Sequence, residues 1–220
     1  MKATNLIVIF LFPMFYSCGQ KANHKFDPLA VRLNNQAIGL MMTSRGNKDG
    51  SLKAIVLLDS ATKIDSNYFR AYYNKLMFMN ELGLYEKAVQ TVNNLIRINP
   101  YAQDLYLTGG MLYEKTKDSV MANSYFKKSL SICNSVLDTI NENNKSYYLL
   151  TMDKAINIIL LGDSANGNHM LTQLYNKQND DAYKQLLVPY INKGRREIIE
   201  EAFNPKPVTS TVESLPDSGN

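Results

Sequence analysis

The sequence predicts an all-α protein, a solenoid of about three to four helix–turn–helix repeats with a capping helix at its C-terminal end. The main observation is a 34-residue period, on one phase of which stand the small residues Ala54, Ala88 and Ala122. A proline, Pro100, closes one unit where the chain must leave a helix. No clear strand pattern competes with this interpretation, because the apolar residues recur at helical rather than alternating spacing.

The 34-residue unit resembles the tetratricopeptide repeat, a pair of antiparallel helices, closely over residues 35–136 and loosely over 147–177. The period predicts repeats at 35–68, 69–102 and 103–136 and a degenerate repeat with an insertion at 137–179. Around them, the sequence predicts a signal peptide at 1–17, a tether and the start of the first helix at 18–34, a capping helix at 180–203 and a disordered tail at 204–220.

The first unit should contain helices at about 28–45 and 51–64, because Pro28 favours a helix start and residues 46–50 form a polar turn. In the second unit, Tyr72, Leu76 and Met79 give one buried stripe. Gly83 should end that helix, since the residue past a helix end often needs positive φ. The second helix of the unit is expected at 85–98.

The third unit has Gly110 where the family prefers glycine, and Asp118 and Ser119 provide a cap for its second helix. Beyond Leu137 the period is lost. We expect helices at 147–161 and 169–177 with a turn at 162–168 between them. The capping helix should bend near Pro189, with its Glu and Arg side chains in water.

The N-terminus predicts export. Lys2, an apolar run too short to span a bilayer, and small residues around Cys18 make a secretory signal. This pattern resembles the bacterial lipobox, in which the cysteine is acylated and becomes an anchor; the alternative is a plain signal that leaves Cys18 free. Residues 19–25 carry no acid, so we expect the outer membrane with the protein facing the periplasm.

Composition argues against several other classes. A net charge of +4 gives no basis for nucleic-acid binding. The densest basic spot, Lys193, Arg195 and Arg196, is followed at once by glutamates and is expected to be a solvated helix face rather than a binding patch. His24 and His169 do not combine with the cysteines at any recognised metal-ligand spacing. Cys133 lies in an apolar helical run and should be a small buried residue. We find no catalytic constellation and predict no enzyme, cofactor or metal.

The resemblance implies that the first helix of each unit lines a concave groove that binds an extended peptide. By family register, the groove-facing residues are Arg70, Tyr73, Asn74, Met77, Asn80, Asp104, Thr108 and Met111. The alternative for each residue is an ordinary solvated helix position. Some members hold a C-terminal carboxylate with a Lys and Asn set, of which only Asn74 is present, so chaperone-tail binding is not expected.

Asp followed by Ser or Thr and an aliphatic residue occurs four times and resembles the O-glycosylation acceptor of envelope proteins in one bacterial phylum. Ser119, Thr139 and Ser164 lie in predicted turns and are the candidates, whereas Ser60 lies inside a predicted helix. Helix capping also favours Asp-Ser pairs.

Together these features predict a lipid-anchored scaffold that binds another envelope protein or peptide. The alternative is an accessory subunit of an envelope enzyme or transport complex.

Overall fold

The computed structural model describes residues 25–43 and 47–204, and most of these residues are helical. The helices are α1 (Pro28–Thr43), α2 (Lys48–Ile64), α3 (Phe69–Glu81), α4 (Tyr85–Ile98), α5 (Gln103–Lys115), α6 (Ser119–Leu137), α7 (Tyr147–Leu160), α8 (Ser164–Lys177), α9 (Asp181–Leu187) and α10 (Arg195–Phe203). The two described ranges contain no β-strand. The predicted all-α class is therefore confirmed.

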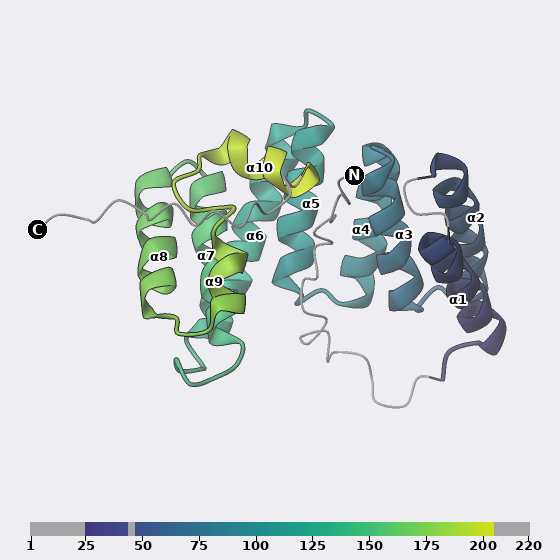
Figure 1. The fold of residues 1–220 in the computed structure, drawn as a ribbon, viewed down its shortest axis with the longest axis horizontal. Helices are drawn as coiled ribbons and strands as arrows, with labels where there is room; N and C mark the ends of the chain where they lie inside the picture. Colours follow the sequence, from purple (N-terminus) through teal and green to yellow (C-terminus); the bar gives the residue numbers. More distant parts are fainter. Residues whose placement is uncertain (1–24, 44–46, 205–220) are drawn as a thin grey trace, which may run out of the picture.

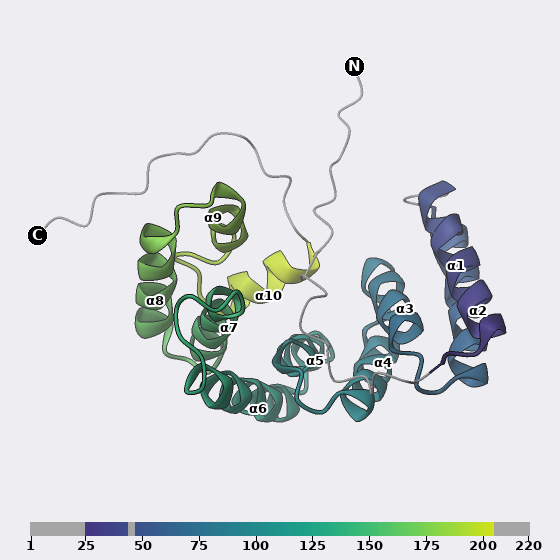
Figure 2. The same cartoon turned by 90° about the horizontal axis from the view of Figure 1, so that it is seen from below.

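The first eight helices form four hairpins that stack side by side (Figure 1). Each helix packs mainly on the helices before and after it in the chain, as in a solenoid whose repeats contact only their neighbours. The stack curves into an arc, with α3, α5 and α7 on its inner side and α4 and α6 on its outer side (Figure 2). This is the arrangement that the 34-residue period predicts.

The residues that repeat at 34-residue spacing mark the contacts between helices. All nine members of three sets are fully buried: Ala54, Ala88 and Ala122; Leu58, Val92 and Phe126; Ala61, Leu95 and Ser129. Small side chains at the first set let the second helix of each unit approach its neighbours closely, and the larger second set fills the space beside them. The period therefore reports the packing of the core.

The backbone turn between the two helices of a hairpin also recurs at 34-residue spacing. Gly83 has φ +66°, and the Leu84 amide donates to the Met79 carbonyl oxygen at 2.8 Å, which closes the end of α3. The equivalent backbone bond after α5, 34 residues later, is 2.9 Å long. There Lys117 takes the place of the glycine, with φ +65°. A lysine accepts this left-handed conformation only at some cost in free energy.

The α7–α8 hairpin has the same turn at a different spacing. The Asp163 amide donates to the Ile158 carbonyl oxygen at 3.1 Å, and Gly162 has φ +109°. Asp163 follows its counterpart Asp118 by 45 positions rather than 34. Of the eleven extra residues, five lengthen α6 relative to α4, five lengthen the connection 138–146 relative to 99–102, and one lengthens α7 relative to α5. This hairpin is therefore a fourth repeat preceded by an insertion.

Two helix starts differ from the prediction. α2 begins at Lys48 rather than residue 51, because the Asn47 side chain accepts the Asp49 amide at 3.0 Å and caps the helix earlier. The predicted turn at 162–168 is wrong for most of its length. Asp163 accepts the Asn166 amide at 3.1 Å, and α8 begins at the next residue.

The capping helix predicted over 180–203 is two helices. α9 ends at Leu187, and the seven residues 188–194 separate it from α10. They include Asn192 with φ +59°, a conformation in which no helix continues. α10 does not extend the stack; it returns along the inner side of the arc, beside α5 and α7 (Figures 1 and 2).

Two apolar cores meet at α5. Leu105 and Leu112 belong to a core formed with α1 to α4, whereas Leu107 and Met111 belong to a core formed with α6 to α10. Phe203, at the end of α10, packs against both cores. α5 is therefore the one helix through which each core is built onto the other.

The close approach of α5 and α6 depends on a glycine. A Cβ atom on Gly110 would lie 2.3 Å from the nearest carbon of the Phe126 ring, whose side chain is fully buried. We expect Gly110→Ala to lower the free energy of unfolding by about 1–3 kcal/mol, because the ring must move within a packed core. Urea unfolding followed by helical circular dichroism measures this change.

Gly39→Ala is the matched control, since a Cβ at that position in α1 meets nothing within 4 Å. The same substitution there should leave stability unchanged or raise it by up to about 1 kcal/mol. Equal effects of the two substitutions would contradict the packing argument.

Candidate functional site

The inner side of the arc carries the residues that the family register assigns to a partner. On α3, Arg70 is exposed, and Tyr73, Met77 and Asn80 are half-buried. On α5, Asp104 and Thr108 are half-buried. These six side chains combine a cation, a phenol, a thioether, an amide, a carboxyl and a hydroxyl on neighbouring helices.

Asn74, also assigned to the partner surface, is engaged within the protein. It is 6% exposed, and its Nδ2 donates to Oδ1 of Asn34 on α1 at 2.7 Å. Asn34 is 1% exposed, so the bond lies in the seam between the two first helices. Asn34 precedes its partner by 40 residues rather than 34, and the period therefore gave no sign of this pair.

Met111 is 8% exposed and belongs to the second core, as does its neighbour Leu107 on α5. Its thioether therefore contributes to packing between α5 and the helices that follow. Of the eight residues that the register assigned, Asn74 and Met111 are the two with least surface available to a partner.

The Asp104 carboxylate on α5 influences the Tyr73 phenol on α3. Burial raises the pKa of the Tyr73 phenol, and the nearby Asp104 carboxylate raises it further. Burial also raises the pKa of Asp104, although hydrogen bonds from backbone amides at the start of α5 oppose that shift. Tyr73 lies in addition beside Phe69, with the ring centroids 6.3 Å apart.

A buried polar layer lies behind this surface, between α5, α6 and α7. Asn157 donates from Nδ2 to Ser129 Oγ and to the Asp153 carbonyl oxygen, both at 2.8 Å. Ser129 in turn donates to the Gln103 carbonyl oxygen at 2.8 Å. Gln103 Nε2 donates to Asp153 Oδ2 at 3.3 Å. The layer ties the third hairpin to the fourth.

Within this layer, the Asp153 side chain is the one whose ionised form is disfavoured by burial. It is 2% exposed, and burial is the main cause that raises the pKa of its carboxyl to about 8, with the Asp104 carboxylate next. The Gln103 hydrogen bond lowers the pKa by a smaller amount. A carboxyl so enclosed does not meet a substrate, so its raised pKa is a consequence of packing rather than a catalytic feature.

Cys133 lies close to the same layer and is fully buried, as the sequence predicts. Burial raises the pKa of its thiol, and the nearby Asp153 carboxylate adds to the shift. The thiol is therefore neutral and inert at physiological pH. Within residues 25–43 and 47–204, no group of three or more His, Cys, Asp or Glu side chains could hold a metal ion.

α10 brings a second set of charged and aromatic side chains to the inner side. The Arg195 guanidinium donates to Asn123 Oδ1 at 2.8 Å and to the Leu160 carbonyl oxygen at 2.5 Å, and it forms an ion pair with Glu114. Its charge also lies 5.4 Å from the centroid of the Phe126 ring. The prediction that the Arg residues of this segment face water is wrong for Arg195.

The opposite end of α10 meets the second hairpin. The Phe203 ring packs edge-on against Tyr85, at the start of α4, with centroids 5.3 Å apart. The Lys115 ammonium lies 5.2 Å from the Tyr85 centroid and 5.3 Å from that of Phe203. The 34-residue period does not predict these contacts, because it does not place residue 203 beside residue 85.

The Asp-Ser and Asp-Thr sequences have structural roles in this fold. Asp118 and Asp163 are N-caps, so Ser119 and Ser164 are the first residues of α6 and α8. Ser119 is exposed and Ser164 half-buried. Thr139 is exposed just beyond α6, and its hydroxyl donates to the Val136 carbonyl oxygen at 2.7 Å.

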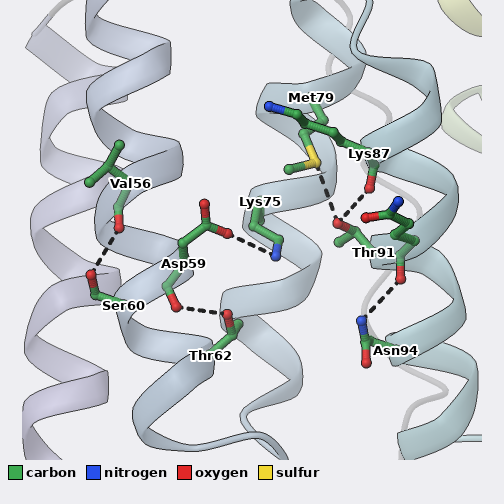
Figure 3. Close-up of polar contacts among 10 residues, drawn as sticks. Val56, Asp59, Ser60, Thr62, Lys75, Met79, Lys87, Thr91 and Asn94 are labelled. Carbon is green, nitrogen blue, oxygen red and sulfur yellow. Dashed lines mark hydrogen bonds and ion pairs between the residues drawn. The ribbon is translucent and has the colours of Figure 1, made fainter.

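The first of these sequences lies in the middle of α2, as Figure 3 shows. Asp59 pairs with Lys75 of α3 at 3.1 Å, and Ser60 donates to the Val56 carbonyl oxygen one turn earlier at 3.1 Å. Lys75 is 9% exposed, and its ammonium lies 5.2 Å from the Tyr72 ring centroid. Asp59 therefore compensates a charge held between two repeats.

Cys18, the predicted signal peptide 1–17, the tether before Lys25 and residues 205–220 of the predicted tail lie outside the described residues. Within residues 25–43 and 47–204, no helix has both the length and the apolar character needed to cross a bilayer.

Comparison with known proteins gives structural matches alone. No protein-family model matches the chain, and neither does any curated protein. Among solved structures, the chain is similar to the crystal structure of a tetratricopeptide repeat protein from Parabacteroides merdae ATCC 43184. The two are 18% identical, the alignment covers 80% of this chain and 73% of that chain, and the TM-score is 0.42.

The buried carboxyl predicts a pH dependence of stability. Because the pKa of Asp153 is about 8 in the folded protein and near 4 in the unfolded chain, the folded state binds one more proton between these values. The contribution of Asp153 to stability should therefore be full below about pH 4 and be lost as pH rises to about 8, with a slope on the order of 1 kcal/mol per pH unit.

Asp153→Asn removes this titration and keeps the shape of the side chain. Urea unfolding at pH 5, 6, 7 and 8 should show a smaller loss of stability in the variant than in the wild type. Identical slopes for the two proteins would show that Asp153 does not carry the effect.

Proposed function

We propose that this chain is a scaffold that binds a short segment of another protein on the concave side of its first three repeats. The observation that carries the proposal is the row of partly exposed side chains of mixed chemistry on α3 and α5, both on the inner side of the arc. Polar groups would fix the backbone of a bound segment, and Met77 would supply an adaptable apolar contact.

The inner surface is suited to binding because contacts within the protein hold its helices in place without a partner. The Asn34–Asn74 bond holds α1 against α3, and the polar layer around Asp153 holds α5 against α7. A rigid surface loses little conformational freedom on binding, which favours affinity without a large contact area.

A binding experiment should substitute residues whose side chains are accessible to solvent, such as Arg70 and Met77. We expect the double variant Arg70→Ala/Met77→Ala to weaken partner binding about tenfold or more, the equivalent of about 1.4 kcal/mol. A photo-crosslinking amino acid at position 80, used in native membranes, would first identify the partner. Titration of the purified partner would then give the dissociation constants.

The matched control is Glu86→Ala/Gln90→Ala, which removes two exposed side chains from α4 on the outer side of the arc. This variant should bind as the wild type does. Equal affinities for all three proteins would exclude the concave side as the binding surface.

We further propose that the protein is held at a membrane of the bacterial cell envelope by acyl chains on Cys18. The support is the sequence alone: a positive start, a short apolar run and a cysteine between Ser17 and Gly19. Two acyl chains anchor a protein firmly, whereas one gives only marginal binding. The partner would then be another envelope protein.

Metabolic labelling with a fatty-acid analogue tests the anchor. Wild-type protein should carry the label and sediment with membranes, and Cys18→Ser should lose both properties. Cys133→Ala is the control for loss of a thiol and should remain labelled. Label retained on Cys18→Ser would sink the proposal.

A further inference from the structure

We propose that α10 is an intramolecular strap that holds the solenoid at one curvature and covers the end of α5 and the inner side of the fourth repeat. The strap itself is inferred from contacts within the chain. Its consequence for partners, that they are confined to the inner side of α1, α3 and α5, rests on the proposed function.

The strap is fixed at its first residue. Arg195 joins Glu114 at the end of α5, Asn123 in the first turns of α6 and the carbonyl oxygen of Leu160 at the end of α7. The guanidinium is 28% exposed and Glu114 19%, so the pair is shielded from solvent more than an ordinary surface pair. One side chain thus links three consecutive helices.

The middle of α10 is buried in the second core. Ile198 is fully buried and Ile199 is 7% exposed, and both pack with residues of α7 and its neighbours. Burying two such side chains contributes about 1.5–3 kcal/mol each. The N-terminal two-thirds of the strap is therefore a permanent part of the fold and is not displaced by a partner.

The end of the strap crosses to the other core. Phe203 packs on Tyr85, and Lys115 lies close to both rings. A helix rises 1.5 Å per residue, so α10 spans about 12 Å from Arg195 to Phe203. Over that distance it connects the end of α7 to the start of α4 along the inner side of the arc, past α5 (Figure 2).

This crossing adds to the contacts that set the curvature, one of which joins α6 to α4 directly where the Tyr125 hydroxyl donates to Asn93 Oδ1 at 2.6 Å. The first core contains α1 to α4 and the second contains α6 to α10, and α5 and Phe203 are the elements that pack against both. A solenoid bends through small changes at the interfaces between repeats. A contact on the inner side that joins α4 to the second core opposes the opening of the arc.

The strap also limits the surface available to a partner. Glu114 and Lys115 lie about one helical turn beyond Met111 in α5, and Arg195, Tyr85 and Phe203 already occupy them. The end of α5 and the inner side of the fourth repeat are thus covered by the chain itself. The face that remains is that of α1, α3 and the first turns of α5.

The experiment measures curvature without a partner. Spin labels attached to cysteines at Lys53 on α2 and Gln173 on α8, both exposed, report the distance between the two ends of the arc in the full chain. Cys18→Ser and Cys133→Ala remove the native thiols. In the Phe203→Ala variant we expect a longer and broader distance distribution than in the parent protein, with the helical circular dichroism unchanged.

Arg196→Ala is the matched control, because that side chain is 89% exposed and pairs with Glu200 one turn later. The Arg196→Ala variant should give the same distance distribution as the parent protein. Phe203→Leu keeps an apolar side chain at this position and removes the ring contacts. If Phe203→Ala loses helicity, the distance distribution of Phe203→Leu tests the strap instead. A distribution unchanged in the folded variant would overturn the strap. Because no partner is present, failure of the binding proposal leaves this result unaffected.

Discussion

The architecture depends on how closely the two helices of a repeat approach each other. At the crossing points the side chains are alanine, serine or glycine, and all are inaccessible to solvent. Where Gly110 faces Phe126, even one methyl group lacks room. Because equivalent positions carry small buried residues in successive repeats, the hairpins stack on one another, and α3, α5 and α7 come to lie along one inner surface (Figure 2). Any binding surface on that side is a consequence of packing at these positions.

Most of the fold can be predicted from the sequence, but less of the candidate site can, for a physical reason. Local patterns fix helices, because the apolar stripe, the capping side chain and the residue with positive φ lie within a few positions of each other. Thus Tyr85–Ile98 has the predicted bounds, and Gly83 has the predicted conformation. Errors arose where two local signals compete. In residues 162–168, the polar composition suggests a turn, whereas the Asp163 cap starts a helix.

The site could be predicted only as far as the period extends. Register identified Arg70, Tyr73 and Met77 as partly accessible residues of a first helix, but it also included Asn74, whose amide is bonded to Asn34. That bond joins two helices whose offset differs from the repeat. The contacts of Arg195 and Phe203 link positions 35 to 118 residues apart and obey no local pattern. Such contacts depend on tertiary structure alone.

The position of α10 also bears on how this chain can change in evolution. Arrays of identical units gain or lose whole repeats readily, because each new unit meets the same neighbours. Here a helix of fixed length reaches from α7 back to α4, so the number of units between its two ends is itself constrained. Insertion of a 34-residue unit in that interval would separate Arg195 from Glu114 or Phe203 from Tyr85. The contacts at the two ends of α10 therefore constrain the number of repeats that can lie between them.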